Sequence, residues 1–186
     1  MSPLTQPTTA SEHYFWDERT DSFWKDQYPA AQGPSTTLLY NTDDPARRAV
    51  LIGGYDGYVR FFDPNALDDD GTAISSRIRF TPITPGGVFA SSRLNDIHIV
   101  TDTRSGAVNF SLFTGDTAQT ANTAATSGAA RLSRVLVAGR NTSMRQRISQ
   151  NTLVPVMAHS VVGESWAFES GGATVELLNR MHGKRV

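Results

Sequence analysis

Hydrophobic and polar residues alternate with a period of two along most of this chain. Residues 73–82 show the pattern clearly, because one face of an extended chain there would carry Ile74, Ser76, Ile78 and Phe80. The same alternation recurs over residues 106–115 and 172–179, whereas residues 152–162 form a more continuous apolar run. Successive side chains of a strand point to opposite faces, so these segments predict half-buried strands and one more fully buried strand.

Turn signals separate the predicted strands at short intervals. Clusters of Gly, Asp and Pro occur at GGYDG (53–57), DDDG (68–71), TPGG (84–87) and ESGGA (169–173). Many short strands with such spacing are typical of an all-β protein. Pro155 lies inside the apolar run, and because proline cannot donate to a β-ladder it predicts an edge strand or a bulge there.

One segment departs from the period of two. Residues 114–130 are rich in Thr and Ala, and they predict either a long surface loop or a short helix from about Thr117 to Ala125, capped by Asp116.

The chain divides into three predicted regions. Residues 1–12 resemble an extended N-terminal arm, with two prolines and several hydroxyl side chains. Residues 13–85 contain two antiparallel hairpins of the kind found in propeller blades, each with an aromatic or apolar run on both sides of a short turn. Residues 86–186 carry enough predicted strands for a small β-sandwich.

The stretch LIGGYDGYVRFFDP (51–64) admits three interpretations: a phosphate loop, a metal site or a tight hairpin. A phosphate loop needs a helix after its glycines, but YVRFF favours a strand. The following DPNALDDDG fails the EF-hand register, which leaves only a loosely held Ca²⁺ as a minor alternative. The hairpin interpretation is preferred, with residues 50–53 as a buried strand and glycines that allow positive φ angles in the turn.

The composition argues against catalysis. The chain of 186 residues has no cysteine, no HxH or HExxH spacing among its four histidines and no GxSxG motif. His98 and His159 fall inside strand patterns, where each is expected to be a wall residue of the sheet. The carboxylate pairs Glu164–Glu169 and Asp56–Asp63 are of a kind that any surface with 18 acidic residues offers by chance. We therefore predict no enzyme activity, no catalytic residues, no cofactor and no metal.

No membrane association is expected either. The longest apolar runs contain only a handful of residues, far fewer than the roughly 18–20 needed to cross a bilayer. The N-terminus lacks the basic and apolar regions of a signal peptide.

Charge is distributed unevenly, although the net charge is −1. Residues 1–70 carry 12 acidic and 5 basic side chains (−7), and residues 131–186 carry 8 basic and 3 acidic ones (+5). Two interpretations of the arginine-rich basic set remain open: the codon usage of a GC-rich genome, or an acidic end of one subunit that meets the basic end of another. The arginines between 131 and 147 also suit weak, non-specific contact with DNA.

Several segments resemble stretches of structural proteins of tailed bacteriophages, in which a Gly-Asp hairpin precedes a DDGTAI strand. They are GGYDGYVRFFDP (53–64), DDDGTAISSRIRFTP (68–82), SLFTGDTAQTA (111–121), AGRNTSMRQRIS (138–149) and GESWAFESGGATVELLNRMHGKR (163–185). The resemblance covers about residues 13–186. It implies a virion component of the tail or neck, such as a nozzle, adaptor or minor tail protein, assembled in the cytoplasm of the bacterial host. The chain departs from such proteins in size. A propeller needs four or more blades, and residues 13–82 could supply at most one or two.

The resemblance implies a protein that acts through subunit–subunit assembly. Its expected partners are other tail or neck proteins and symmetry-related copies of itself. The expected interface residues are Tyr55, Tyr58, Arg60, Arg140, Arg145 and Arg147. The alternative is a carbohydrate- or receptor-binding module at the tail tip, for which the aromatic residues between 13 and 26 would form a platform.

Overall fold

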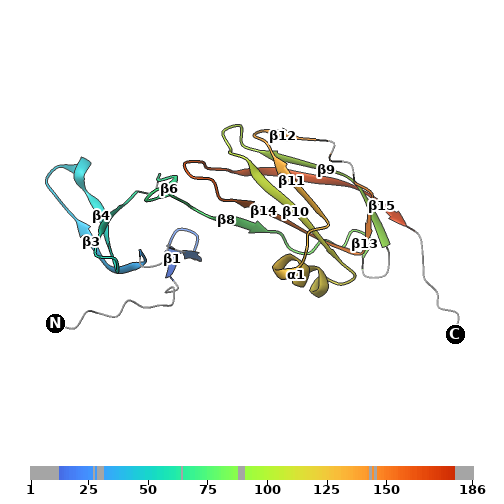
Figure 1. Cartoon of the computed structure of the whole chain (residues 1–186), viewed down its shortest axis with the longest axis horizontal. Coiled ribbons are helices and arrows are strands. Elements are labelled where there is room, and N and C mark those ends of the chain that lie inside the picture. Colours follow the sequence, from blue (N-terminus) through green and yellow to red (C-terminus); the bar gives the residue numbers. More distant parts are fainter. Residues whose placement is uncertain are drawn as a thin grey trace. The chain divides into compact units, whose positions relative to one another are not determined.

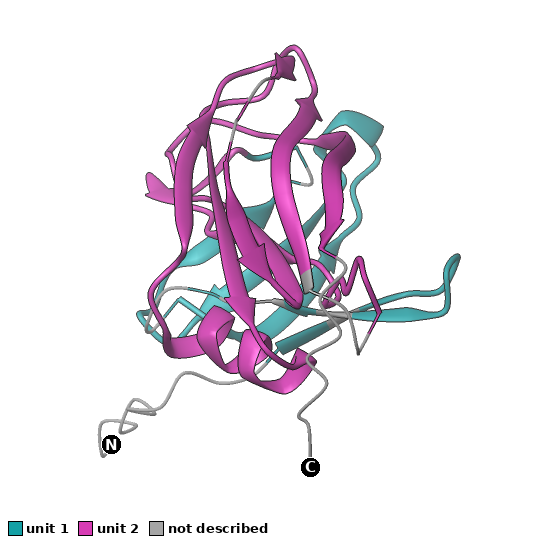
Figure 2. Ribbon diagram, turned by 90° about the vertical axis from the view of Figure 1, so that its right-hand side faces the viewer, with its two compact units in different colours: residues 1–66 teal, residues 67–186 magenta. Residues whose placement is uncertain are grey.

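The structure is a computed structural model that describes residues 13–26, 28, 32–63, 65–87, 91–142, 144 and 146–178. The expected arm, residues 1–12, lies outside the described residues. Within the described residues the chain is all-β, with antiparallel sheets and one α-helix, as the sequence predicted (Figure 1). The chain forms two compact units, residues 1–66 and 67–186, each of which is described by itself (Figure 2).

The first unit contains a hairpin and a three-stranded sheet. The hairpin pairs β1 (His13–Asp17) with β2 (Ser22–Asp26). The sheet has the order β3-β4-β5, with strands β3 (Pro34–Tyr40), β4 (Ala49–Gly54) and β5 (Val59–Phe62). A 3₁₀ turn, Pro45–Arg47, joins β3 to β4, and the Asp44 side chain caps it by accepting a hydrogen bond from the Ala46 N–H at 3.0 Å.

The second unit is a β-sandwich preceded by a small two-stranded hairpin, β6 (Asp68–Asp69) with β7 (Thr72–Ala73). One sheet has the order β11-β10-β14-β8; its strands are β8 (Ser76–Arg79), β10 (Val108–Gly115), β11 (Leu132–Leu136) and β14 (Thr152–His159). In the other sheet β9 (Ser91–Thr101) pairs on one side with β12 (Arg140–Asn141) and β13 (Ile148–Gln150), and it also pairs with β15 (Phe168–Leu178).

The sandwich core lies between these two sheets. Phe110, Leu112 and Met157 from the first sheet pack in one cluster with Leu94 and Ile99 from the second, and all five are almost fully buried. The predicted alternation over residues 106–115 is confirmed, because Val108, Phe110 and Leu112 are buried while Asn109 is exposed.

The helix α1 (Ala118–Ser127) covers the outer face of the first sheet. Ala121 and Ala125 pack against Phe113, Val154 and Val156, which explains why β14 is apolar on both faces. The sequence left open a loop or a helix capped by Asp116, and the structure has a helix whose N-cap is Thr117. Thr117 and Thr120 form a reciprocal capping box, with bonds of 3.2 and 3.0 Å.

Pro155 was expected in an edge strand or a bulge. β14 is not an edge strand, because it lies between β10 and β8, but its ladder with β8 does have a bulge opposite Pro155, since the four residue steps from Arg79 to Ile83 oppose the three from Val156 to Leu153. The ladder with β8 ends at the pair Val156–Arg79 and resumes as an isolated bridge between Ile83 and Leu153. The interruption lies opposite Pro155, whose carbonyl still accepts a bond from the Phe80 N–H at 3.1 Å. The missing proline donor is thus accommodated by a break in the neighbouring strand.

The division between the units differs from the boundary expected at residues 85 and 86. The units meet between Ala66 and Leu67, and residues 67–85 belong to the second unit. The reason is strand pairing, since β8 hydrogen-bonds to β14 over residues 76–79 and extends the sandwich sheet.

Candidate functional site

The hairpin of β4 and β5 carries three of the expected interface residues, Tyr55, Tyr58 and Arg60. Its turn is closed by the Gly54 N–H, which donates to the Tyr58 carbonyl at 2.9 Å. Gly57 has φ +84°, a conformation that favours glycine. The glycine therefore shapes the backbone of a hairpin, as predicted for the stretch 51–64.

A two-pronged ion pair fixes the conformation of this turn. The Arg60 guanidinium donates to Asp56 Oδ1 and Oδ2 at 3.1 and 2.7 Å, while Asp56 Oδ1 also accepts the Tyr58 N–H at 3.1 Å. The hydrogen bonds from Arg60 hold the pKa of Asp56 below its usual range, with further help from the Tyr58 N–H and the positive charge. The guanidinium carbon also lies 5.7 Å from the centre of the Tyr58 ring.

The strand register assigns the side chains of the three-stranded sheet to two faces. Residues directly opposite each other in antiparallel strands share a face. We name one side the Leu38 face; it comprises Thr36, Leu38, Tyr40, Ala49, Leu51, Gly53, Val59 and Phe61. We name the other side the Leu39 face; it comprises Thr37, Leu39, Val50, Ile52, Arg60 and Phe62.

Both faces are apolar, and both are largely exposed in this chain. On the Leu38 face Val59 is 70% and Phe61 is 60% exposed, and on the Leu39 face Leu39 is 69% exposed. Val50 was expected in a buried strand but is 39% exposed. Ala49 is the one buried hydrophobic residue among those that the structure describes in the first unit, so the described sheet has no core of its own.

The β1–β2 hairpin presents a second apolar surface. Trp16 and Phe23 face each other across the strands, with ring centres 6.3 Å apart and planes 19° apart. Tyr14, Trp16 and Phe23 are all more than half exposed. The Trp16 indole N–H donates to Asp21 Oδ1 at 3.4 Å, which ties the ring to the turn of the hairpin.

The expected arginine group lies in the second unit and is only partly described. Arg140 is exposed in β12, opposite Val100 of β9, and Arg145 lies outside the described residues. Arg147 is exposed just before β13 and borders a polar hollow that Arg93, Asp96 and Glu176 also line. Arg93 and Glu176 approach to 3.6 Å there. The hollow carries charges of both signs, so it is not a uniformly basic track of the kind that follows a phosphate backbone.

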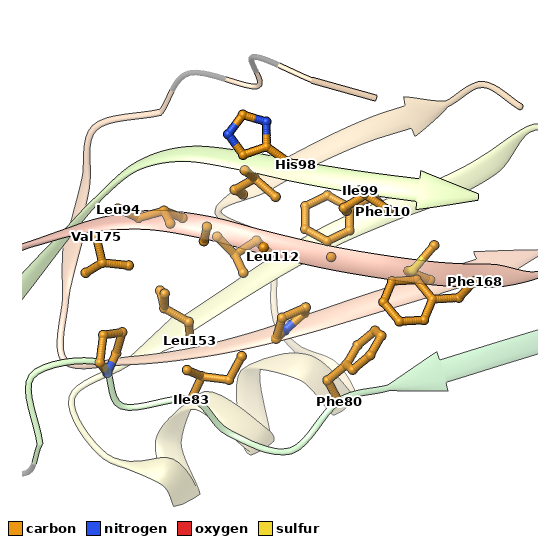
Figure 3. A pocket seen from close by; sticks show the side chains of 17 residues that line it. Phe80, Ile83, Leu94, His98, Ile99, Phe110, Leu112, Leu153, Phe168 and Val175 are labelled. Carbon is orange, nitrogen blue, oxygen red and sulfur yellow. The ribbon is translucent and has the colours of Figure 1, made fainter. Parts of the chain in front are cut away.

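An apolar cavity of about 190 Å³ lies between the two sheets of the sandwich (Figure 3). Phe80 and Ile83 line it from the segment after β8, while Leu112 and Leu153 come from β10 and β14 (Figure 3). Phe80 meets Phe168 edge to face, with ring centres 5.2 Å apart. His98 is the one polar side chain among the described residues that line the cavity, and the rest of that lining is apolar.

Glu164 and the two histidines considered in the sequence have local structural partners. Glu164 Oε2 lies 3.3 Å from Nε2 of the buried His159, and Asp96 Oδ2 lies 3.6 Å from His98 Nε2. Within the described part of the chain no three His, Asp or Glu side chains gather as a metal site. No helix formed by the described residues has the length and hydropathy to cross a membrane.

Neither a family model nor a curated protein sequence matches this chain.

The sequence pointed to the β4–β5 hairpin but not to the two-sided character of its sheet. The signal was present, because the runs LLY (38–40) and AVLI (49–52) are apolar at consecutive positions rather than at alternate ones. Such runs mark strands that are covered on both faces. They do not show whether the cover comes from the same chain.

Proposed function

We propose that this protein is a structural component of a bacteriophage virion, of the tail or neck, and that it acts by assembling with other chains through the three-stranded sheet of its first unit. The observation that carries this proposal is the exposure of apolar side chains on both faces of that sheet. A catalytic role would instead need convergent polar groups in a pocket.

Energetics favour a covered sheet. Fully burying one large aliphatic or aromatic side chain contributes about 1.5–3 kcal/mol relative to leaving it in water. Seven of the exposed large apolar residues that the structure describes lie in this sheet, which are Leu38, Leu39, Tyr40, Val50, Val59, Phe61 and Phe62. Contiguous apolar patches of this kind mark interaction surfaces in soluble proteins.

The virion assignment rests on the resemblance of residues 53–64, 68–82, 111–121, 138–149 and 163–185 to segments of tailed-phage structural proteins. In that setting the acidic N-terminal part of one subunit would face the arginine-rich C-terminal part of its neighbour, so the two surfaces in contact would carry opposite charges. The exposed Arg140 and Arg147 remain candidates for contacts with neighbouring proteins and for weak contact with packaged DNA.

A second candidate function is carbohydrate binding on the β1–β2 hairpin. The observation that favours it is the exposed, nearly parallel pair of Trp16 and Phe23 beside Tyr14. A flat aromatic surface suits the apolar face of a sugar ring, and Asp17 and Asp21 lie at the turn of the same hairpin. Saturable binding on a glycan array that Trp16→Ala abolishes would establish this function.

The direct test of the assembly function is the composition of purified particles. We expect mass spectrometry to find the chain in particles of the phage whose genome encodes it, at a fixed number of copies per particle. Phe61→Glu should reduce that incorporation at least tenfold, whereas Val135→Glu, on an exposed strand position of the second unit, should leave it unchanged. Absence of the wild-type chain from purified particles would refute the proposal.

A further inference from the structure

The apolar cavity of the sandwich lies between the margins of its two sheets. β15 is an outer strand, since it pairs with β9 and with no other strand that the structure describes. Residues 80–85 follow β8, the outer strand of the opposite sheet, and both segments line the cavity (Figure 3). Ile83 is 47% exposed and Ala173 is also exposed, although both belong to the lining. The cavity therefore reaches solvent at a rim formed by these two residues.

The sequence of β15 creates this space. Gly171 and Ala173 lie opposite buried isoleucines of β9, so both share the inner face of the sheet. A Cβ atom at Gly171 would lie 3.3 Å from the Phe168 ring, which occupies part of the place of a side chain there. The small residues at these two positions leave a void that larger side chains would fill. Native cores keep few voids larger than a water molecule, so a cavity of about 190 Å³ has room for a ligand.

The interior of the cavity suits an apolar occupant. The His98 side chain is 44% exposed and its Nε2 lies 3.6 Å from Asp96 Oδ2, and Figure 3 shows its ring across the β9 ribbon from Leu112 and Leu153. On the opposite wall the backbones of Ile83 and Leu153 exchange two hydrogen bonds, of 2.8 and 2.9 Å. A buried water needs two to four polar partners, and a buried charge needs even more compensation. The described side chains that face the interior offer neither.

The size and shape of the cavity select among apolar molecules. Phe80 and Phe168 lie at one end of the lining, and Leu94 and Val175 lie at the other (Figure 3). The part of β15 from residue 171 to residue 175 alone spans roughly 13 Å, so the lining is elongated along this strand and fits a chain better than a ring. An apolar cavity of about 150 Å³ holds benzene, with its six carbons. By the same measure about 190 Å³ holds about eight carbons.

We propose that this cavity binds an unbranched alkyl chain of about eight carbons, with the polar end of the amphiphile in water at Ile83 and Ala173. The proposal goes beyond the assembly function and does not depend on it, because the lining belongs entirely to the second unit. A free fatty acid or alcohol and the acyl chain of a membrane lipid share this chemistry. The experiment therefore has to establish the binding first and then distinguish the two sources.

The test titrates the full chain with straight-chain alcohols from 1-butanol to 1-decanol, by calorimetry and by NMR of ¹³C-labelled methyl groups. We expect saturable binding of 1-octanol, with shifts at the methyl groups of Ile83, Leu112 and Leu153 and none at the exposed Val135 of β11. The affinity should rise about fourfold for each added CH₂ group. Beyond about eight carbons it should level off, because the additional carbons stay in water.

Two matched substitutions in β15 locate the binding. Ala173→Leu adds a side chain that takes up space in the cavity, so it should weaken the binding of 1-octanol by about tenfold or more. Thr174→Leu adds the same side chain on the outer face, where Thr174 borders the polar hollow, and should leave the affinity unchanged. Phe61→Glu should also leave it unchanged, which separates the cavity from the exposed sheet of the first unit. Circular dichroism checks that each variant is folded, and the chain-length series on the wild type needs no substitution.

A wild type that shows no saturable binding of 1-octanol would overturn the proposal. So would an affinity that keeps rising up to 1-decanol, or a folded Ala173→Leu chain that binds as tightly as the wild type. Co-sedimentation with phosphatidylcholine vesicles that Ala173→Leu abolishes would assign the cavity to the acyl chain of a membrane lipid. Binding of 1-octanol without co-sedimentation would assign it to a free amphiphile, and either result supports an alkyl-chain site.

Discussion

At the scale of single residues, the Asp56–Arg60 pair makes the β4–β5 turn sensitive to acid. The pKa of Asp56 is lowered chiefly by hydrogen bonds from Arg60. A carboxyl whose pKa is lower in the folded state stabilises the fold above its unfolded value of about 3.9, and this contribution is lost as the pH falls through the lowered folded value. We expect the first unit to lose stability below about pH 4.

Two variants separate this effect from general acid unfolding. Asp56→Asn and Arg60→Gln both remove the charge pair. In each variant the stability of the first unit should therefore change less than in the wild type as the pH is lowered. Two-dimensional NMR of the amides in residues 49–62, recorded at several pH values, gives the readout. If Asp56→Asn shows the same acid profile as the wild type, the pair does not stabilise the hairpin.

The sequence predicted the backbone of this turn but not its ion pair. GYDG is a strong hairpin signal because glycine readily takes a positive φ, and Gly57 does so. The contact forms because the local twist of β5 brings the Arg60 side chain over the turn to Asp56. The spacing of the two residues in the sequence does not determine that twist. Arg60, which the sequence marks as a candidate interface residue, has its guanidinium engaged with Asp56 within the hairpin.

At the scale of elements, two adjacent residues, Asp116 and Thr117, both suit the N-cap of α1, and the structure selects Thr117. Thr117 accepts a hydrogen bond from the Thr120 N–H and donates its own N–H to the Thr120 hydroxyl. Thr117→Ala should lower the free energy of unfolding by about 1 kcal/mol. Asp116→Ala should change it by no more than about 0.5 kcal/mol. Chemical denaturation of the second unit measures both, and a larger loss for Asp116→Ala would contradict the assigned cap.

The approach of α1 to β10 depends on Gly115. A Cβ atom there would lie 2.9 Å from Ala121 Cα and would also overlap the Ala121 N, so the helix backbone would have to shift. We expect Gly115→Ala to destabilise the second unit by about 1–3 kcal/mol. Gly172→Ala in β15 is the matched control, because its Cβ would meet nothing within 4 Å. Equal melting temperatures for the two variants would show that the helix does not pack closely at Gly115.

The type of each element was predictable where the hydrophobic periodicity was strong. Features that depend on the pairing of distant strands were not predictable from it. The run 152–162 predicted a strand, and Pro155 predicted an edge or a bulge in it. The structure has the bulge, and the sequence could not choose between the two because the irregularity in the neighbouring strand at residues 80–82 is a tertiary feature. The boundary near residue 85 followed Pro and Gly composition, whereas the actual division follows the pairing of β8 with β14, about 80 residues away in the chain.

At the scale of the whole molecule, the two units bury their apolar residues very differently. The second unit contains the large buried cluster around Phe110, Leu112 and Met157, whereas the described first unit buries only Ala49 among its hydrophobic residues. Two- and three-stranded sheets without a covered face are marginal in water. The first unit should therefore draw most of its stability from whatever covers its sheet.

This difference predicts two unfolding transitions with different responses to protein concentration. Association that occurs only in the folded state raises the apparent stability by mass action, so the transition of the first unit should move to higher temperature as the concentration rises. The transition of the sandwich should stay in place, because its core is internal to one chain. Calorimetry at several concentrations, with amide NMR to assign each transition, measures both.

Phe61→Glu should abolish the concentration dependence of the first transition while leaving the second unchanged. A first transition that is sharp and independent of concentration would mean that the unit is stabilised within its own chain, and the two apolar faces would then need a different explanation.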